Sequence, residues 1–436
     1  MTGTTPLTGR AVSRRGLLAG FGVLGTLGAL SLAGCATSAP GGSAKGAATD
    51  TESINFYGNA LGEDAQKAAW QAVIDGWQRQ TGKKIKPVVF PYDQASTQLA
   101  LAAKTGDFDG VGQGPWQVLV PTGILADVSD LAATMDLPGT SVDSFRINGK
   151  LYFIPINASG IGLVCDGRIA DEVGLSDSMT VEDFATALEK IKKQDPKVIP
   201  YAAVTENPDL KDAVHWMWGW GSPVVTDSLR CTIGDAPSVA AITWYKGLQD
   251  AGLTKAGVNR SDARILFAQG QTAMYDDAPL ADSFVRTNGG SAALQAAIRP
   301  LRRPAYRTVP SANRFWGSGL FCSAGEGEQT SKDFINYVAT NVSAATALYQ
   351  ESSLAPADAK VAAQVPGLNK DAFQSAFRTA VADHSRASAW DALASSAEID
   401  TAIGQGVAGI LAGQSGVQSG LNALRKTVQG ILAQNS

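Results

Sequence analysis

Apolar residues recur along the chain with two alternating periods. Residues 54–57 and 85–90 are short apolar runs typical of strands, whereas residues 64–80 place apolar side chains at helical spacing. Gly82 follows that helical run and is expected to end it. Residues 96–104 predict a second helix. Because strands and helices alternate, the pattern predicts an α/β fold with a parallel sheet.

The same alternation continues into the middle of the chain. Residues 150–155 and 161–165 predict two strands, and residues 181–193 predict a helix with Thr180 as its N-cap. Further on, helices are expected over 240–252 and 261–269, and a strand over 272–275. From residue 390 onward apolar side chains again recur at helical spacing, which predicts two closing helices.

The first 35 residues hold three features in the order of an export signal. Arg10, Arg14 and Arg15 come first, the apolar stretch 16–34 follows, and Cys35 comes last. This order is that of a signal peptide. The stretch is rich in Gly, Ala and Ser, which makes a retained transmembrane anchor the weaker alternative.

Two short motifs refine the predicted export route. Residues 13–18, Ser-Arg-Arg-Gly-Leu-Leu, resemble the twin-arginine motif that exports folded proteins, with Sec export as the alternative. Residues 32–35, Leu-Ala-Gly-Cys, resemble the bacterial lipobox, in which the thiol receives a diacylglyceryl group and the peptide is cut before it. We therefore expect residues 1–34 to be removed and Cys35 to anchor the chain to the outer face of the cytoplasmic membrane. Residues 35–52 are expected to form a flexible tether.

Composition fits a sizeable globular protein. The chain has 436 residues, of which 44% are hydrophobic and 17% charged, so it can bury large cores, and its length favours two or more domains. Without the three signal-peptide arginines it has 33 basic and 40 acidic residues, a net charge of about −7. That balance disfavours nucleic acid as a partner.

Cysteine and histidine are sparse. Apart from Cys35, the thiols are Cys165, Cys231 and Cys322, in a compartment that tolerates disulfides. Cys165 and Cys322 lie in apolar, strand-like runs, where a small buried hydrophobe is the simplest interpretation. No Cys-x-x-Cys pair exists and His215 and His384 stand alone, so neither a metal site nor a cofactor is expected.

Several motifs, taken in order, resemble one large family. The phrase Gly-Lys-Leu-Tyr-Phe-Ile-Pro at 149–155 is similar to its "G-K-x-Y-G-I-P", and Phe-Ala-Gln-Gly-Gln-Thr-Ala-Met at 267–274 to its "F-x-x-G-K-A-A-M". Weaker likenesses lie at 92–109, 123–131, 173–184 and 353–356. The chain thus resembles the extracellular solute-binding proteins of ABC importers, in the carbohydrate-binding group that includes the maltose-binding proteins.

This resemblance implies a two-lobe periplasmic-binding-protein fold of type II, the Venus flytrap, with hinge strands between lobes that close on a ligand. The N-terminal lobe would comprise residues 53–164 and about 323–360, and the C-terminal lobe residues 165–322 and about 361–436. Cys165 and Cys322 would then fall in neighbouring hinge strands. A hinge disulfide between them is one hypothesis, and two buried free thiols are the alternative.

A sugar-binding pocket needs flat aromatic rings for the apolar ring faces and polar groups for the hydroxyl rim. Trp216, Trp218 and Trp220 lie within five positions, which local geometry cannot easily bury together, so we expect at least one to face a cleft. The alternative is two in the core and one on the surface. Trp390 could line the far side, although ordinary helix packing explains it slightly better.

The resemblance places further candidate ligand contacts. In the second lobe they are Arg314 and Trp316 before a hinge strand, with Tyr275 and Asp277 after the Ala-Met phrase. Alternation on a strand puts Asp277 on the face of Tyr275 and points Asp276 away. A surface salt bridge for Arg314 and a solvated turn for the Asp pair are the structural alternatives. In the first lobe the candidates are Asn59, Gln113, Trp116 and Ser159.

The resemblance implies a monomeric binding protein, not an enzyme, that captures a mono- or oligosaccharide and delivers it to ABC permease subunits in the membrane. A glycerophosphodiester, a polyol or another polar non-sugar solute is the runner-up ligand, because Arg314 could bind a phosphate or an acid. A secreted hydrolase is a minor alternative, since neither Gly-x-Ser-x-Gly nor His-Glu-x-x-His occurs. A structural lipoprotein would require repeats or low-complexity stalks, which are absent after residue 50.

Overall fold

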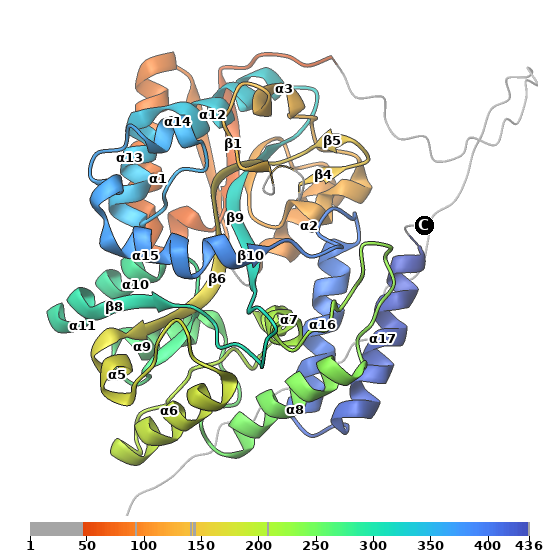
Figure 1. Cartoon of the computed structure of the whole chain (residues 1–436). Coiled ribbons are helices and arrows are strands. Elements are labelled where there is room, and N and C mark those ends of the chain that lie inside the picture. Colours follow the sequence, from red (N-terminus) through yellow and green to blue (C-terminus); the bar gives the residue numbers. More distant parts are fainter. Residues whose placement is uncertain (1–46, 92–93, 140–141, 143–144, 207–208, 435–436) are drawn as a thin grey trace, which may run out of the picture. The chain divides into compact units, whose positions relative to one another are not determined.

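The computed structural model describes residues 47–91, 94–139, 142, 145–206 and 209–434 (Figure 1). The predicted signal peptide 1–34, Cys35 and the tether up to residue 46 lie outside this range. The predicted tether is too long at its C-terminal end. The Thr49 N–H donates to the Gly325 carbonyl (3.1 Å) and the Thr51 N–H to the Thr330 hydroxyl (2.9 Å), so these residues are attached to the body of the protein.

Ten strands are described, eight of them in one mixed sheet of order β2-β1-β3-β9-β6-β7, with β10 beside β9 and β8 beside β6. The strands are β1 Ser53–Gly58, β2 Lys84–Val89, β3 Gly110–Gln113, β4 Arg146–Ile147, β5 Lys150–Leu151, β6 Ile154–Asp166, β7 Met274–Asp277, β8 Ile298–Leu301, β9 Asn313–Cys322 and β10 Ser385–Arg386. The predicted parallel pairing holds for β1 with β2 and with β3, whereas β6 and β9 pair antiparallel.

Helices cover the sheet and form much of the second half of the chain (Figure 1). The longer ones are α1 Asp64–Thr81, α2 Ala95–Thr105, α6 Val181–Gln194, α8 Ala236–Asp250, α9 Arg260–Ala268, α12 Glu328–Thr340, α13 Val342–Ser352, α15 Ala372–Ala380, α16 Ser396–Leu411 and α17 Val417–Ala433. The short ones are α3 Ser129–Ala132, α5 Gly167–Val173, α7 Val214–Gly219, α10 Ala281–Thr287, α11 Ala292–Ala297 and α14 Ala359–Ala362, with 3-10 turns η1 Ala60–Gly62, η3 Trp116–Thr122, η4 Asp209–Ala213, η5 Leu368–Lys370 and η6 Ala382–His384. None of the described helices is both long and apolar enough to cross a membrane.

Local sequence signals set several of these boundaries as predicted. Gly82, in the left-handed conformation (φ 77°), ends α1. Thr180 and Asp183 form a capping box that begins α6. The prediction of a separate strand over 161–165 is wrong, because 154–166 is one continuous strand whose polar middle hides its continuity in the sequence.

Two large apolar cores lie at the two ends of β6. Ile154 and Ile156 belong to the core that includes α1, β1, β3 and α12, whereas Leu163 and Cys165 belong to the core that includes α6, α7, α16 and α17. β9 runs antiparallel beside β6 along most of its length (Figure 1). The middle of this strand pair therefore connects one core to the other.

Glycines on β6 allow a close approach of the chain segment 381–385. A Cβ on Gly160 would overlap the Ser385 hydroxyl, and one on Gly162 would overlap the Val381 side chain. This segment leads directly into β10, where Arg386 pairs in parallel register with Arg314 of β9. One face of the β6–β9 pair is thus covered by residues 381–385, which leaves polar side chains to the other face.

Candidate functional site

The middle of the β6–β9 pair presents a row of polar and aromatic side chains on one face. Cross-strand partners point to the same face of a sheet and alternate residues share it. Asn157 pairs with Ser318, and Ser159 pairs with Trp316. Arg314, two positions before Trp316, continues the row. We call Asn157, Ser159, Arg314, Trp316 and Ser318 the polar face.

Gln113, the last residue of β3, extends the polar face on its β9 side. Its amide Nε2 donates to the Ser318 hydroxyl (3.3 Å), and the Ser318 N–H donates to Asn157 Oδ1 (2.8 Å). Gln113 is buried, and its Oε1 has no hydrogen-bond partner among the described residues. A buried acceptor without a donor is costly, so this oxygen is a ready acceptor for a hydroxyl. Asn59, by contrast, donates to Glu63 Oε1 (2.5 Å).

Arg314 is buried and held by carboxylates rather than exposed in a surface salt bridge. Its Nη2 lies 2.8 Å from both carboxylate oxygens of Asp400 and 3.2 Å from Asp391, and its Nη1 lies 3.8 Å from Asp212. Burial raises the pKa of Asp391, whereas the pKa of Asp400 is lowered by Arg314 and Lys211 in spite of its burial. The charge of Arg314 is therefore balanced within the protein.

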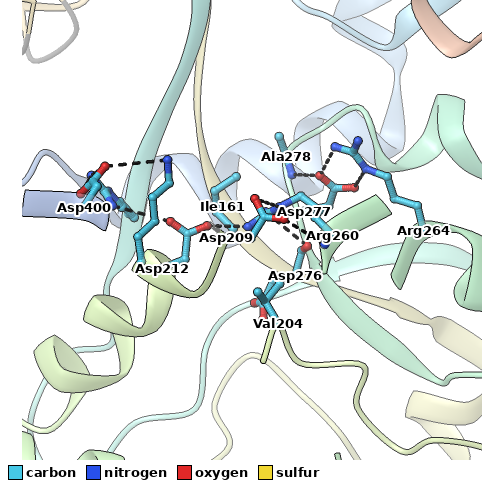
Figure 2. Close-up of polar contacts among 12 residues, drawn as sticks. Ile161, Val204, Asp209, Asp212, Arg260, Arg264, Asp276, Asp277, Ala278 and Asp400 are labelled. Atoms are coloured by element: carbon cyan, nitrogen blue, oxygen red, sulfur yellow. Dashed lines mark hydrogen bonds and ion pairs between the residues drawn. The ribbon is translucent and has the colours of Figure 1, made fainter. Parts of the chain in front are cut away.

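Asp212, which lies 3.8 Å from Arg314, belongs to a network of buried charges with Asp209 and Arg260. Figure 2 shows Asp212, Asp209 and Arg260 together. Asp212 also accepts from Arg260 Nη2 (2.5 Å), and the Arg260 N–H donates to Asp209 (3.0 Å). Arg303 is bound by Asp276, which also accepts from the Tyr201 hydroxyl. Alternating charges of this kind fix side-chain orientations, because leaving any one of these buried charges without its partner would cost free energy.

Asp277 and Tyr275 lie on β7, and Asp277 points away from Asp276 as strand alternation predicts. Both Asp277 oxygens accept from Arg264, at 2.7 and 2.9 Å (Figure 2). Tyr275 is fully buried in a core cluster. A solvated turn at the Asp pair is therefore wrong, because both carboxylates are buried against arginines. Asp277 pairs with Gly162 of β6, on the face that residues 381–385 cover, so Asp277 and Tyr275 point away from the polar face and their predicted ligand contact there is wrong.

A cavity of about 10 Å³ lies inside the charge network, lined among others by Asp209, Asp212, His215, Arg260 and Asp276. This volume admits one water molecule and no sugar. Burial and the neighbouring arginines hold the pKa of His215 well below its ordinary value, so the imidazole is neutral. The cavity belongs to the scaffold of the site.

Trp216, Trp218 and Trp220 are all buried, so this structure shows neither the expected ring facing a cleft nor the alternative of one ring on the surface. Helix α7 is enclosed by other aromatic residues: Trp216 lies 4.9 Å from Trp244, and Trp220 stacks on Tyr306 at 4.9 Å. Aromatic neighbours distant in sequence help to bury Trp216 and Trp220, which spacing alone cannot reveal.

Two of the buried rings are covered by arginines of the β9–β10 pair. The Arg386 guanidinium lies 4.3 Å from the centre of the Trp218 ring, whose indole N–H donates to the Pro223 carbonyl (3.2 Å). Arg314 lies 5.7 Å from the Trp390 ring, and the Trp390 indole N–H donates to Asp400 (2.9 Å). Trp390 is fully buried, in a turn before α16 rather than within a helix.

The remaining two predicted tryptophans differ. Trp116 is 1% exposed in the first core, where it stacks on Phe153 at 5.9 Å. Trp316 is half-buried and lies on the polar face, so part of its ring surface is accessible to a ligand there. Alternation from Ser159 and Trp316 could have identified Asn157 and Ser318, which the sequence reasoning missed. No local signal marks Asp391, Asp400 or Arg386.

The hypothesis of a Cys165–Cys322 disulfide is wrong. Both thiols are buried and unbridged, as is Cys231. Ile154 of β6 and Leu320 of the antiparallel β9 are cross-strand partners. Cys165 lies eleven residues beyond Ile154 and Cys322 lies two residues beyond Leu320, so the two cysteines lie in opposite directions from this pair. Roughly 40 Å of strand therefore separates two residues whose Cα atoms would need to lie about 6 Å apart.

Comparisons with known proteins agree with this architecture. Residues 72–383 match the model of the bacterial extracellular solute-binding protein family. The melibiose/raffinose/stachyose-binding protein MelE of Bacillus subtilis (strain 168) is 25% identical over 170 residues, which are 37% of this chain and 39% of MelE. The match to this relative thus spans well under half of its length.

Solved structures share the fold at low sequence identity. The GacH receptor of Streptomyces glaucescens, solved unliganded and with acarbose, has a TM-score of 0.77 at 19% identity, covering 88% of this chain and 99% of that one. A solute-binding protein of Thermotoga lettingae bound with α-D-tagatose has a TM-score of 0.78 at 14% identity, covering 88% and 100%. Maltose-bound MalE3 of T. maritima gives 0.77 at 16% identity, covering 87% and 99%.

These structures are two-lobe binding proteins, and TM-scores of 0.77 and 0.78 show that this chain shares their fold. The family model extends over most of the chain, from residue 72 to residue 383. This chain therefore belongs to the bacterial extracellular solute-binding protein family.

Proposed function

We propose that this chain captures a mono- or oligosaccharide on the polar face and delivers it to the membrane permease of an ABC importer. The observation that carries the proposal is the composition of that face. It combines a half-buried indole, Trp316, with the amide and hydroxyl groups of Gln113, Asn157 and Ser159 on strands that run between two cores. Rings for sugar faces and neutral polar groups for hydroxyls are what carbohydrate binding requires.

The ligands of similar proteins support the same class. MelE is named for melibiose, raffinose and stachyose, and the similar solved structures hold acarbose, tagatose or maltose.

The proposed lobes are residues 53–164 with about 323–360, and 165–322 with about 361–436. Separate apolar cores at the two ends of β6 support this division.

A phosphodiester or other anionic ligand is the weaker alternative. Arg314 is the residue that would bind a phosphate, but two carboxylates already bind its guanidinium and a third lies 3.8 Å from it. An anion would have to displace Asp391 or Asp400 from a buried pair. Neutral saccharides and polyols need no such exchange.

The remaining parts of the proposal concern location and assembly. Twin-arginine export, lipidation of Cys35, a monomeric state and a non-catalytic role follow from the N-terminal motifs and from the family. A lipid at Cys35 would hold the binding protein at high effective concentration beside its permease. Mass measurement of the protein from membranes tests this directly, because a diacylglyceryl group at Cys35 and loss of residues 1–34 are both visible as mass changes.

Ligand class is tested by thermal unfolding of the purified protein with maltotriose, raffinose, tagatose, glycerol and glycerophosphocholine. A ligand at one hundred times its Kd should add about 2.7 kcal/mol to the free energy of unfolding. Stabilisation by the phosphodiester and by none of the sugars would make the saccharide proposal wrong.

Placement of the site is tested with Trp316→Ala, which should lose most of the stabilisation by sugar. The matched control is Tyr337→Ala, which removes another half-buried aromatic ring from the first core, on α12. The control should unfold at a lower temperature yet keep its full response to sugar. Equal sugar stabilisation of Trp316→Ala and wild type would show that the ligand binds elsewhere.

A further inference from the structure

Arg386 lies on β10 beside the polar face and, among the described residues, has no carboxylate bound to it. Its parallel pairing with Arg314 turns both side chains to the same face of the β9–β10 pair. Among the described residues, the Arg386 side chain forms no hydrogen bond or ion pair, and the residue is exposed. Arg314, one strand away, is buried and bound by two carboxylates.

The Arg386 guanidinium carbon lies 4.3 Å from the centre of the Trp218 ring, and Asp227 attracts this guanidinium without forming an ion pair with it. Trp218 is only 4% exposed, and its indole N–H is fixed by the Pro223 carbonyl. The orientation of the Trp218 ring is therefore fixed, and an exposed side chain lies over one of its faces. A cation–π contact at an exposed site is weak, about 0.5–1 kcal/mol, so this cover can be removed at little cost.

From this geometry we infer that Arg386 is a removable cover on Trp218, and that a sugar ring takes its place on the indole when ligand binds. The inference rests on the proposed function for its ligand. It explains how a ring that sequence spacing assigns to the ligand can be buried in this structure. The affinity for sugar is then set partly by the loss of the Arg386 contact, which makes Arg386 an affinity-determining residue.

The cover is tested first without any ligand. Arg386→Ala should expose the Trp218 ring and increase acrylamide quenching of tryptophan fluorescence. The same substitution in a Trp218→Phe background should change the quenching much less, because the uncovered ring is then absent. Arg378→Ala, which removes an exposed arginine from α15, is the control for lost charge and should leave quenching unchanged. Unchanged quenching in Arg386→Ala would overturn the inference.

The second arm measures maltotriose and raffinose binding by calorimetry. Without a contact to displace, Arg386→Ala should bind the sugar about twofold to fivefold more tightly than wild type. A tenfold or greater loss of affinity would instead make Arg386 a direct donor to the sugar and overturn the cover. If neither sugar binds the wild type, the proposed function fails for these sugars, while the quenching arm still decides whether Arg386 covers Trp218.

Discussion

Replacing Arg314 by Met tests whether this arginine stabilises the fold or serves the ligand. The substitution keeps much of the side-chain volume and removes the charge. Asp400 would then keep the Trp390 indole N–H (2.9 Å) and the more distant Lys211 (3.8 Å), and Asp391 would keep the Ser388 N–H (2.7 Å). Two neighbouring carboxylates would be left without the cation that both now bind.

The size of the loss follows from burial. Breaking a buried ion pair by removing one partner costs about 3–5 kcal/mol. The side chains of Asp391 and Asp400 are 15% and 14% exposed, so water screens them in part and the lower end of that range applies. We expect Arg314→Met to lower the free energy of unfolding by about 3 kcal/mol at neutral pH.

The loss should shrink in acid. Burial already raises the pKa of Asp391 in the wild type, and Arg314 opposes that rise, so removing Arg314 lets the pKa rise further. A protonated Asp391 no longer repels Asp400. Because protonation of Asp391 relieves the variant more than the wild type, the difference in unfolding free energy between them should narrow as the pH falls towards about 5.

Urea unfolding followed by tryptophan fluorescence, at about pH 7.5 and about pH 5, measures both effects. Adding Asp400→Asn to Arg314→Met should recover part of the lost unfolding free energy, since it removes one buried charge that has lost its partner. The control Arg378→Ala should change the unfolding free energy very little. A loss below about 1 kcal/mol at neutral pH, or one that grows in acid, would refute the reasoning. Simple additivity of the two substitutions would do so as well.

Three further predictions concern the same region. The pKa of Asp400 is lowered and that of Asp391 is raised, so Asp400→Asn should lower the free energy of unfolding more than Asp391→Asn does. Urea unfolding at neutral pH measures this difference, which should disappear as the pH falls through the folded-state pKa of Asp400. Gly160→Ala should lower the free energy of unfolding by about 1–3 kcal/mol, because the added Cβ would overlap Ser385 of β10. A Cβ at Gly219 meets nothing within 4 Å, so Gly219→Ala should be tolerated. Equal melting temperatures of the two variants would contradict this. Burial raises the pKa of Cys165 to about 12, so iodoacetamide should label its thiol in denaturant only, and labelling of the native protein seen by mass spectrometry would contradict the buried position.

Sequence predicts those parts of this fold that local chemistry decides. The end of α1 at Gly82 and the start of α6 at Thr180 depend on residues within one turn, so both were predictable. The continuity of β6 was not, because Asn157 and Ser159 interrupt its apolar pattern while β9 supplies their backbone partners. Non-local pairing overrides the local pattern there.

The candidate site divides in the same way. Trp316, Gln113 and Ser159 were predicted from the family's motifs, and the strand register brings them together. The charge balance of Arg314 was not predictable, because Asp391 and Asp400 come from a segment more than seventy residues away along the chain. Burial of a tryptophan or an arginine depends on such distant partners, and spacing within one segment carries no record of them.

The two arginines of the β9–β10 pair suggest where the ligand preference of this protein can change. Arg314 is bound by two carboxylates and covers Trp390, so moving it would disrupt a buried network. Arg386 covers Trp218 through one weak contact and borders solvent. A substitution at Arg386 therefore alters the surface offered to a sugar at little cost in stability, whereas one at Arg314 costs several times more before it affects binding. Selection for a different saccharide should act on Arg386 first.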